Sequence, residues 1–264
     1  MKQTMMILTM SGILGTCALN AYNGHTVVIK DTSDGTKILM LETSKRDRLY
    51  WGPDIFWSDE SPNIKGINVK GDSIYYGLRA GYDFLRPNSM YAGIDALYAV
   101  GRTNLKAEMA EKELYKDKIT GTVGRGELRL GYNFVGEDKI YFSPFIGVGG
   151  YHSRSVKAIH FVQNWLYLTM GMKVDYEITP KVNAGLNIKG MRALYLEQSI
   201  EKNSVSAERH DNSNALGYEV SIPLTMRFGK TNNWDFRLEP YYIKLNSQSD
   251  ANVAGAQFTF SNRF

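Results

Sequence analysis

Cysteine is nearly absent from this chain of 264 residues, which has one, Cys17. One cysteine cannot form a disulfide within the chain, so other interactions must hold the fold together. Histidine is also scarce, and the four histidines are dispersed without the paired spacing that a metal site needs. We therefore predict that the protein binds no metal and no other cofactor.

Long apolar runs and a strong charge of one sign are missing as well. Beyond the N-terminus, no apolar run reaches the roughly 18 residues that a membrane-spanning helix needs. The net charge is only +4, and the basic residues are scattered among acidic ones without a Lys or Arg cluster. Nucleic acid is therefore not an expected partner.

The N-terminus has the layout of a secretory signal peptide. Lys2 precedes an apolar stretch at residues 5–14, and small residues precede Ala18 and Ala21. A buried N-terminal strand or helix is the alternative. We predict a signal peptide at residues 1–21, and hence an exported protein.

Cys17 gives the same segment a second interpretation. Residues 14–17 resemble the lipobox of bacterial lipoproteins, except that Thr16 stands where that pattern has a smaller residue. If cleavage follows Ala18 or Ala21 instead, the mature chain has no cysteine. The sequence leaves lipidation of Cys17 open.

Aromatic residues and glycine are abundant, with 17 Tyr, 11 Phe and 25 Gly, and apolar residues alternate with period two. In GLRAGYDF, residues 77–84, apolar side chains alternate with glycine or charged ones. Such alternation is typical of β-strands with one apolar and one polar face. It recurs in residues 48–57, 72–84, 91–100, 126–134, 140–151, 166–176, 182–189, 216–228, 234–242 and 252–264.

The polar face of these strands distinguishes a soluble sandwich from a membrane barrel. It carries charges of both signs interleaved with glycine, as in Arg79 and Asp83. A solvent-exposed face has little reason to accumulate glycine, which weakens a strand, whereas the narrow polar interior of a barrel needs small residues and neutralised charges. We therefore predict an all-β fold, a transmembrane antiparallel up-and-down β-barrel.

The connections alternate between two kinds. Short ones follow residues 84, 134, 178 and 228, and longer, more polar ones follow residues 102, 151, 195 and 245. This asymmetry is typical of outer-membrane barrels, with short periplasmic turns and longer extracellular loops. Aromatic residues such as Tyr82, Tyr91, Tyr151 and Trp165 gather toward the strand ends, as in interface girdles.

Ten strands are predicted, with eight or twelve as alternatives. An odd number would leave an unpaired edge in lipid, where unsatisfied backbone groups are costly, so residues 48–57 supply the tenth strand. The barrel then covers residues 48–264. Residues 22–47 form a periplasmic segment, in which two short alternating stretches around Ser33 to Gly35 predict a hairpin.

The inner faces of the strands predict a network of charges in the lumen. Its expected members are Arg79, Asp83, Asp95, Glu127, Arg129, Lys173, Asp175, Lys189, Glu219, Arg227, Arg237 and Glu239, and Asp54 faces the same side. Because acidic and basic residues nearly balance in a narrow bore, we predict a salt-bridged plug. A narrow path for ions or small solutes is the alternative.

Several segments together resemble a known class. LYWGPDIFW, GDSIYYGLRAGYDF, MYAGIDALYAVG, ELRLGYNF, FSPFIGVGGY and NWLYLTMGMKVDY occur in this order. They are similar to uncharacterised small outer-membrane barrels of Gram-negative bacteria, including those of chlamydia-like organisms. The resemblance covers about residues 48–264 and implies fold and location, without an activity.

The C-terminal segment FTFSNRF, residues 258–264, resembles the signal that the barrel assembly machinery reads. Phe258, Phe260 and Phe264 alternate along one face, and Asn262 departs from the usual apolar residue at that spacing. The resemblance implies that this machinery is a partner during biogenesis and that the protein is located in the bacterial outer membrane.

Residues 151–155 are a candidate for hydrolytic chemistry. A His152 base beside Ser153 would suit an outer-membrane lipase, but no acid lies nearby in sequence to orient the histidine. We therefore predict a loop histidine and no enzymatic activity, with a lipid-modifying hydrolase as a remote alternative.

Residues 105–118 and 196–214 are charged and long, and the first has the spacing of a short helix. As exposed loops on a rigid barrel, they are suited to binding a host, phage or lipopolysaccharide ligand. We predict a monomeric outer-membrane barrel with a structural or surface-interaction role, and a narrow porin-like channel as the alternative.

Overall fold

The structure is a computed structural model that describes residues 27–31, 37–41, 47–64, 67–86, 88–109, 112–136, 140–156, 160–202, 205–211, 215–229, 234–246 and 249–263. The predicted signal peptide, Cys17 and Phe264 lie outside the described residues. No helix long and apolar enough to cross a membrane occurs among the described residues.

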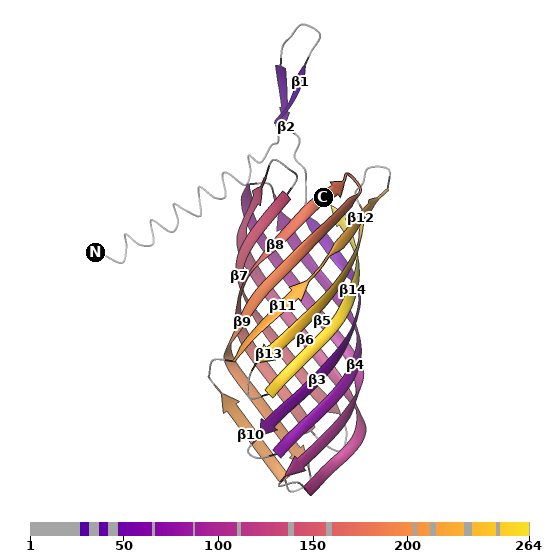
Figure 1. The fold of residues 1–264 in the computed structure, drawn as a ribbon, viewed down its shortest axis with the longest axis vertical. Coiled ribbons are helices and arrows are strands. Elements are labelled where there is room, and N and C mark those ends of the chain that lie inside the picture. The colour runs from indigo at the N-terminus through magenta and orange to yellow at the C-terminus, as the bar shows by residue number, and fades with distance from the viewer. Residues whose placement is uncertain are drawn as a thin grey trace, which may run out of the picture.

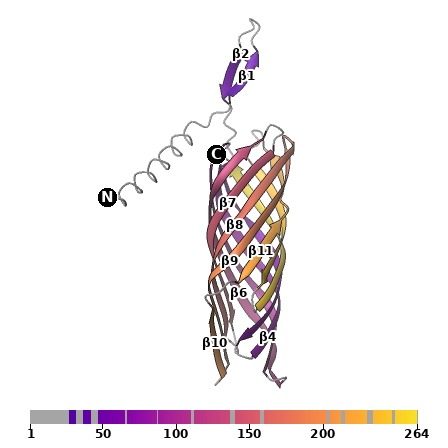
Figure 2. The same ribbon diagram turned by 60° about the vertical axis from the view of Figure 1, so that its left-hand side comes forward.

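A closed wall of ten strands forms the molecule (Figure 1, Figure 2). The strands are β3 (Arg48–Ile64), β4 (Ile67–Leu85), β5 (Ser89–Met109), β6 (Lys112–Val135), β7 (Ile140–Val156), β8 (His160–Thr179), β9 (Val182–Lys202), the interrupted β11 (Leu216–Ser221) and β12 (Leu224–Phe228), β13 (Trp234–Asn246) and β14 (Ser249–Arg263). Neighbours in the chain pair antiparallel, and β14 pairs with β3. The predicted ten-stranded up-and-down barrel is confirmed.

Two further pairings lie outside this wall. β10 (Val205–Asp211) forms a hairpin with the last part of β9, beyond the residues of β9 that pair with β11. β1 (Val27–Asp31) and β2 (Lys37–Leu41), in the segment predicted to be a hairpin, pair antiparallel with each other.

The alternation predicted one strand at residues 216–228, whereas the structure has two, β11 and β12. The run breaks between β11 and β12 at Ile222 and Pro223, because proline has no N–H for a ladder. Two backbone hydrogen bonds still join the interrupted segment to the neighbouring strands. Ile222 N donates to Pro240 O of β13 (3.1 Å), and Gly185 N of β9 donates to Pro223 O (2.8 Å). The wall therefore continues across the interruption.

The predicted long connections are largely strand. β5 runs to Met109 and β6 begins at Lys112, so the short helix expected in residues 105–118 is wrong. Residues 196–202 and 205–211 likewise form a β9–β10 hairpin instead of a loop. The strands continue because Leu105, Ala107 and Ile119 still alternate inward and pack together.

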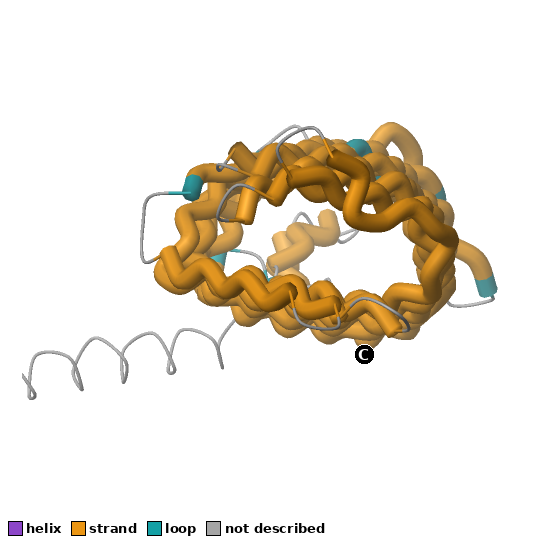
Figure 3. Tube along the Cα trace, turned by 90° about the horizontal axis from the view of Figure 1, so that it is seen from below, coloured by secondary structure: helices purple, strands orange, loops and turns teal. Residues whose placement is uncertain are grey.

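The two ends of the barrel therefore differ in construction. We call the end with connections at residues 86–88, 136–139, 180–181 and 229–233 the turn end, and the other the hairpin end. The hairpin end is seen face-on in Figure 3, where the barrel has an elongated outline. β3 and β9, which are not neighbours in the sheet, also contact each other.

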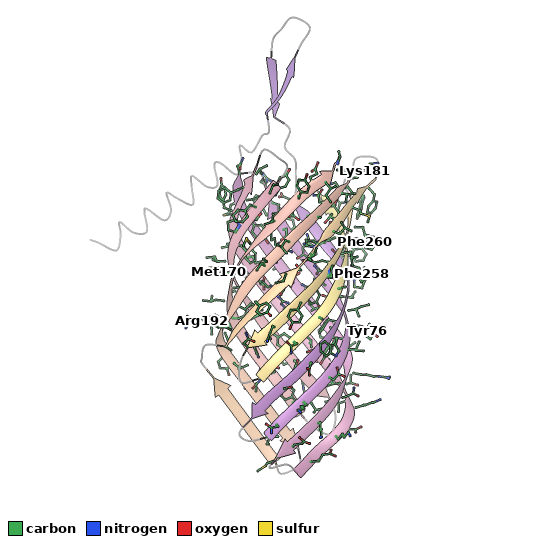
Figure 4. All side chains as sticks on the ribbon, viewed as in Figure 1. Tyr76, Met170, Lys181, Arg192, Phe258 and Phe260 are labelled. Atoms are coloured by element: carbon green, nitrogen blue, oxygen red, sulfur yellow. The ribbon has the colours of Figure 1, made fainter. Side chains whose placement is uncertain are left out.

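A band of exposed apolar side chains encircles the outer wall (Figure 4). Its members include Leu49, Trp51, Ile55, Trp57, Ile74, Tyr76, Leu78, Tyr98, Leu128, Leu130, Ile146, Leu168 and Met170. Met170 is 71% exposed and Leu78 69%, values that water disfavours and a lipid environment explains. On β4 the band begins at Ile74, and the outward residues toward the hairpin end are polar.

Candidate functional site

A layer of ionised side chains fills the turn-end half of the lumen. We call it the charged layer, and it consists of Arg48, Asp54, Arg79, Asp83, Asp95, Arg125, Glu127, Arg129, Lys173, Lys189, Glu219, Arg237 and Glu239. They come from β3, β4, β5, β6, β8, β9, β11 and β13. Ion pairs across the lumen thus join strands that are not sheet neighbours.

Asp83 is the centre of one cluster, with 1% exposure. Arg48 Nη2 lies 2.9 Å from its Oδ2, while Lys173 Nζ (3.4 Å) and Arg129 Nη2 (3.5 Å) approach Oδ1. The Tyr91 hydroxyl also donates to Oδ1 (3.1 Å). One buried carboxylate is therefore shared by three cations from three strands.

Arg79, on the same strand as Asp83, is the centre of a second cluster. Its guanidinium pairs with Asp54 (2.7 Å) and Asp95 (2.9 Å). Tyr241 donates to Asp54 (2.9 Å) and Tyr50 donates to Asp95 (2.9 Å). Both carboxylates thus receive charged and neutral donors, as burial requires.

A third cluster links β6, β9 and β11. Lys189 Nζ lies 2.7 Å from Glu127 and 3.1 Å from Glu219. Arg125 Nη2 lies 2.6 Å from the same Glu219 oxygen, and the Tyr167 hydroxyl donates to Glu127 (3.2 Å). This cluster balances two cations with two carboxylates, whereas the Asp83 cluster has an excess of cations and the Arg79 cluster an excess of carboxylates.

The structure brings together ten of the twelve residues expected in the lumen network, the exceptions being Asp175 and Arg227. Asp175 lies on β8, opposite Tyr141 of β7 and Gly185 of β9. Arg227 pairs with Glu177 (3.2 Å) near the turn end and donates to Pro180 O (3.0 Å).

Arg48 and Arg125 belong to the layer and were missed by the sequence analysis. The expected strand began at 126, one residue after Arg125, although Arg125 shares the parity of Glu127. Arg48 shares the parity of Asp54 in the same way. Extending the strand expected at residues 126–134 by one residue would have identified Arg125, whereas Arg48 already lay within the predicted strand at residues 48–57 and was not assigned to its inner face.

Glycines on the inner face make room for tyrosines within the lumen. A Cβ at Gly81 would lie 2.3 Å from the Tyr50 hydroxyl, and one at Gly149 would lie 2.4 Å from the Tyr167 ring. These are the two tyrosines that donate to Asp95 and Glu127. The abundance of glycine on the polar face thus has the steric cause that the sequence predicted.

Little space is left inside the charged layer. The cavity among Arg48, Arg79, Asp83, Lys173 and their neighbours measures about 50 Å³. A buried water needs about 10–15 Å³ by this measure, so the layer has room for roughly four waters. The side chains of the layer thus leave only a small space between them.

The hairpin-end half of the lumen contains a large apolar cluster beside buried polar side chains such as Ser73, Thr103 and Gln163, whereas a polar lumen was predicted throughout. Phe56, Tyr75, Leu97, Ala99, Val123, Trp165, Tyr167, Met191, Leu196, Tyr241 and Ile243 form one buried cluster. Tyr151 packs against it, so Tyr151 and Trp165, assigned to an outer aromatic girdle, face inward, as does Tyr91. The error arose because aromatic residues near strand ends do not reveal which face they occupy.

His152 and its neighbouring serines lie on opposite faces of β7. His152 is exposed, whereas Ser153 and Ser155 are buried in the lumen. A hydrogen bond of 2.6 Å joins His152 Nδ1 and Asn164 Oδ1, and Asn164 donates to Glu197 (2.8 Å). An acid absent from the local sequence is thus linked to the histidine, but the pairing of His152 with Ser153 that the hydrolase alternative needs is not formed. The predicted loop histidine instead lies within strand β7.

Cations gather on the outer face of β4 to β7, just beyond the apolar band. We call this set the cationic rim: Lys70, Arg102, Lys106, Lys116, Lys118 and Arg154. Lys106 lies directly opposite Lys70 on β4 and Lys116 on β6. Like charges in opposed positions repel. Lys106 forms an ion pair and hydrogen bond with Glu108, which keeps the pKa of Glu108 below its ordinary value.

A groove joins the cationic rim to the apolar band. It measures about 840 Å³, with Asp72, Arg102, Asn104 and Lys118 on its polar side. Ile74, Tyr76 and Val100 line its apolar side, and Figure 4 shows Tyr76 projecting from the outer wall. The groove is therefore amphipathic along the barrel axis.

The C-terminal aromatics lie on the outer face of β14. Phe258 and Phe260 alternate outward there, and Phe260 packs against Trp51 and Phe236. Asn262 shares this face and pairs in register with Trp234 and Leu49. The described residues of the predicted assembly signal therefore lie on the outer face of the barrel, toward its turn end.

Among the residues that the structure describes, no group of three or more His, Cys, Asp or Glu side chains is arranged to hold a metal. No family model matches the chain. No curated protein matches it either.

Solved structures with a similar fold are bacterial outer-membrane β-barrels. The outer-membrane protease OmpT of Escherichia coli matches with a TM-score of 0.63 at 8% identity, over 85% of this chain and 99% of its own. OprG of Pseudomonas aeruginosa gives 0.43 at 12% identity, covering 84% and 98%. The transport unit of AIDA-I from E. coli gives 0.46 at 8%, covering 95% and 98%. The likeness to OmpT shows that the chain has the fold of an outer-membrane β-barrel.

Proposed function

We propose that this protein is a monomeric bacterial outer-membrane barrel with a surface-interaction role and no catalytic one. The turn end is periplasmic and the hairpin end extracellular. Support comes from the signal-like N-terminus, the apolar band and the outward Phe258 and Phe260, which suit insertion by the barrel assembly machinery.

The interaction partner that best fits is a phosphorylated glycolipid of the outer leaflet, the class to which lipopolysaccharide belongs. The observation that carries this proposal is the groove between the cationic rim and the apolar band. Arg102 and Lys118 lie on the polar side of the groove, where they would contact the phosphates of the glycolipid. Ile74 and Val100 lie on its apolar side, where they would contact the first part of the acyl chains. A polyanion would also relieve the repulsion between the opposed lysines of the rim.

Replacing both Arg102 and Lys118 with alanine is expected to weaken binding of bisphosphorylated lipid A. Each cation near an anionic surface contributes about 1 kcal/mol, so the pair contributes about 2 kcal/mol, or roughly 30-fold in affinity. Native mass spectrometry of the detergent-solubilised protein measures the bound lipid. Lys181→Ala, an exposed cation at the turn end (Figure 4), is the matched control and should bind normally. Equal binding of dephosphorylated lipid A would contradict the proposal.

The charged layer also predicts that the unaltered protein does not conduct. In planar bilayers at high salt, insertion of the barrel should give no stable open level, because both the ion pairs and the apolar cluster above them obstruct the lumen. Heat-dependent gel mobility of the same sample verifies that it is folded. A long-lived conductance step would favour the channel alternative instead.

A further inference from the structure

Three lysines of the cationic rim form one row across neighbouring strands, beyond the lipid groove. Lys70 of β4 and Lys116 of β6 are each directly opposite Lys106 of β5, and all three lie on the outer face. We call them the lysine row. Because neighbouring strands lie about 4.8 Å apart, the row has three positive charges within roughly 10 Å. Like charges in directly opposed positions destabilise a sheet, so this arrangement needs a reason.

Nearby acids neutralise the row only in part. A hydrogen bond from Lys106, together with the charges of Lys106 and Lys70, lowers the pKa of the Glu108 carboxyl. Glu113 is the other acid whose charge acts on Lys106. Lys116 has no ion pair in the part of the chain that the structure describes. Three cations therefore share two acids, and the row has an excess of positive charge.

Protection of a strand edge does not account for the whole row. Lysine often prevents an exposed edge from pairing with another chain. That reason applies to Lys116, because β6 extends there beyond its pairing with β7. Lys106, in contrast, lies on a strand that pairs with β4 on one side and with β6 on the other. A lysine at this central position has no edge to protect.

The wall behind the lysine row is packed. Val69, Leu105 and Ile119, on the inner face of the same three strands, are buried in one apolar cluster. The strands thus continue beyond the apolar band as a supported wall, and the lysines project from strands instead of loops. A partner that binds them does not have to order the backbone, which lowers the cost of binding.

The lysine row also lies farther from the membrane than the polar side of the groove. Lys106 is four residues beyond Arg102 on β5. This is about 14 Å along the strand, or about 10 Å along the barrel axis for a strand tilted by about 40°. In the proposed arrangement, Arg102 and Lys118 contact the phosphates of the glycolipid. The row is then level with groups attached outside those phosphates, which in a glycolipid are its core sugars.

We propose that the lysine row binds anionic groups on the core sugars of the same glycolipid. The inference rests on the proposed glycolipid function and adds a second contact to that ligand. Lysine suits this contact, because its ammonium is a compact charge with three donors on a flexible stem and does not need the planar geometry that arginine matches. Contacts at two heights favour a glycolipid with an acidic core over a phospholipid, which has charge at one height only.

Two glycolipids that differ only in core sugars test the proposal. The probes are bisphosphorylated lipid A and lipid A that carries two 3-deoxy-D-manno-octulosonic acid sugars, each with one carboxylate. Native mass spectrometry of the full barrel should show tighter binding of the second probe. Lys70→Ala combined with Lys116→Ala should weaken binding of the second probe about 30-fold and leave binding of lipid A unchanged. Methyl esterification of the two carboxylates should likewise reduce binding to the level of lipid A.

The control variant is Lys244→Ala, at the hairpin end of β13, three strands away from β4. It should leave both affinities unchanged, and heat-dependent gel mobility verifies that each variant is folded. Equal affinity of the unaltered barrel for the two probes would overturn the proposal, as would an equal loss for both probes in the Lys70 and Lys116 variant. If Arg102→Ala with Lys118→Ala leaves lipid A binding unchanged while the lysine variant still loses the second probe selectively, the groove proposal fails and the lysine row stands.

Discussion

Asp83→Ala is expected to destabilise the barrel by about 3–5 kcal/mol, the cost of removing one partner from a buried ion cluster. The carboxylate is enclosed by Arg48, Lys173 and Arg129. Without it, three cations face one another in a space with room for only a few waters. Urea unfolding in lipid vesicles, followed by tryptophan fluorescence and by the mobility of unboiled samples, measures the loss.

The control for Asp83 is an acid on the same strand with the opposite orientation. Asp72 is exposed on the outer face and accepts a hydrogen bond from Trp57. Asp72→Ala should change stability by about 0.5 kcal/mol or less. Adding Lys173→Met to Asp83→Ala should recover part of the loss, because one uncompensated cation is removed. Equal stability of the two alanine variants would show that the cluster does not stabilise the barrel.

The charged layer was predictable from the sequence because its residues obey strand parity. Once Leu78 and Phe84 are assigned to lipid, Arg79 and Asp83 must point inward. Parity alone does not say which strands lie opposite one another, so the triple contact of Asp83 with β3, β6 and β8 could not be predicted. The contact depends on which strands face one another across the lumen of the closed barrel.

The apolar half of the lumen could not be predicted for a related reason. Phe56, Tyr75 and Tyr241 occupy the inner parity, but an aromatic residue suits the outer face of a membrane strand equally well. The strand extensions at the hairpin end were missed because their polar residues were interpreted as loops. In fact, those residues are the outer face of strands that continue past the membrane, with Val69, Leu105 and Ile119 inside.

These two halves have different consequences for function. Ion pairs from many strands hold the turn end in one arrangement. The hairpin-end half is held by apolar packing together with hydrogen bonds such as that from Ser73 to Thr103. The proposed lipid groove also lies toward the hairpin end, on the outer wall.

Closure of the barrel depends on Gly52, where the first and last strands of the wall meet. A Cβ at this position would lie 1.9 Å from Phe258 O and 2.9 Å from Thr259 Cα. The β3–β14 pairing runs from Asp54 with Gln257 to Trp51 with Phe260 and is irregular between them. Pro53 occupies this gap and has no N–H to donate, so the two backbones approach closely there.

Gly52→Ala is therefore expected to reduce the yield of closed barrel sharply. Overpacking costs about 1–3 kcal/mol, and the upper end applies because a backbone oxygen cannot rotate away as a side chain would. Gly124→Ala is the matched control, since a Cβ there meets nothing within 4 Å. It should be neutral or stabilising by up to about 1 kcal/mol through the unfolded chain. Refolding yield into vesicles, scored by heat-dependent mobility, compares the two, and similar yields would mean that the seam tolerates a side chain at Gly52.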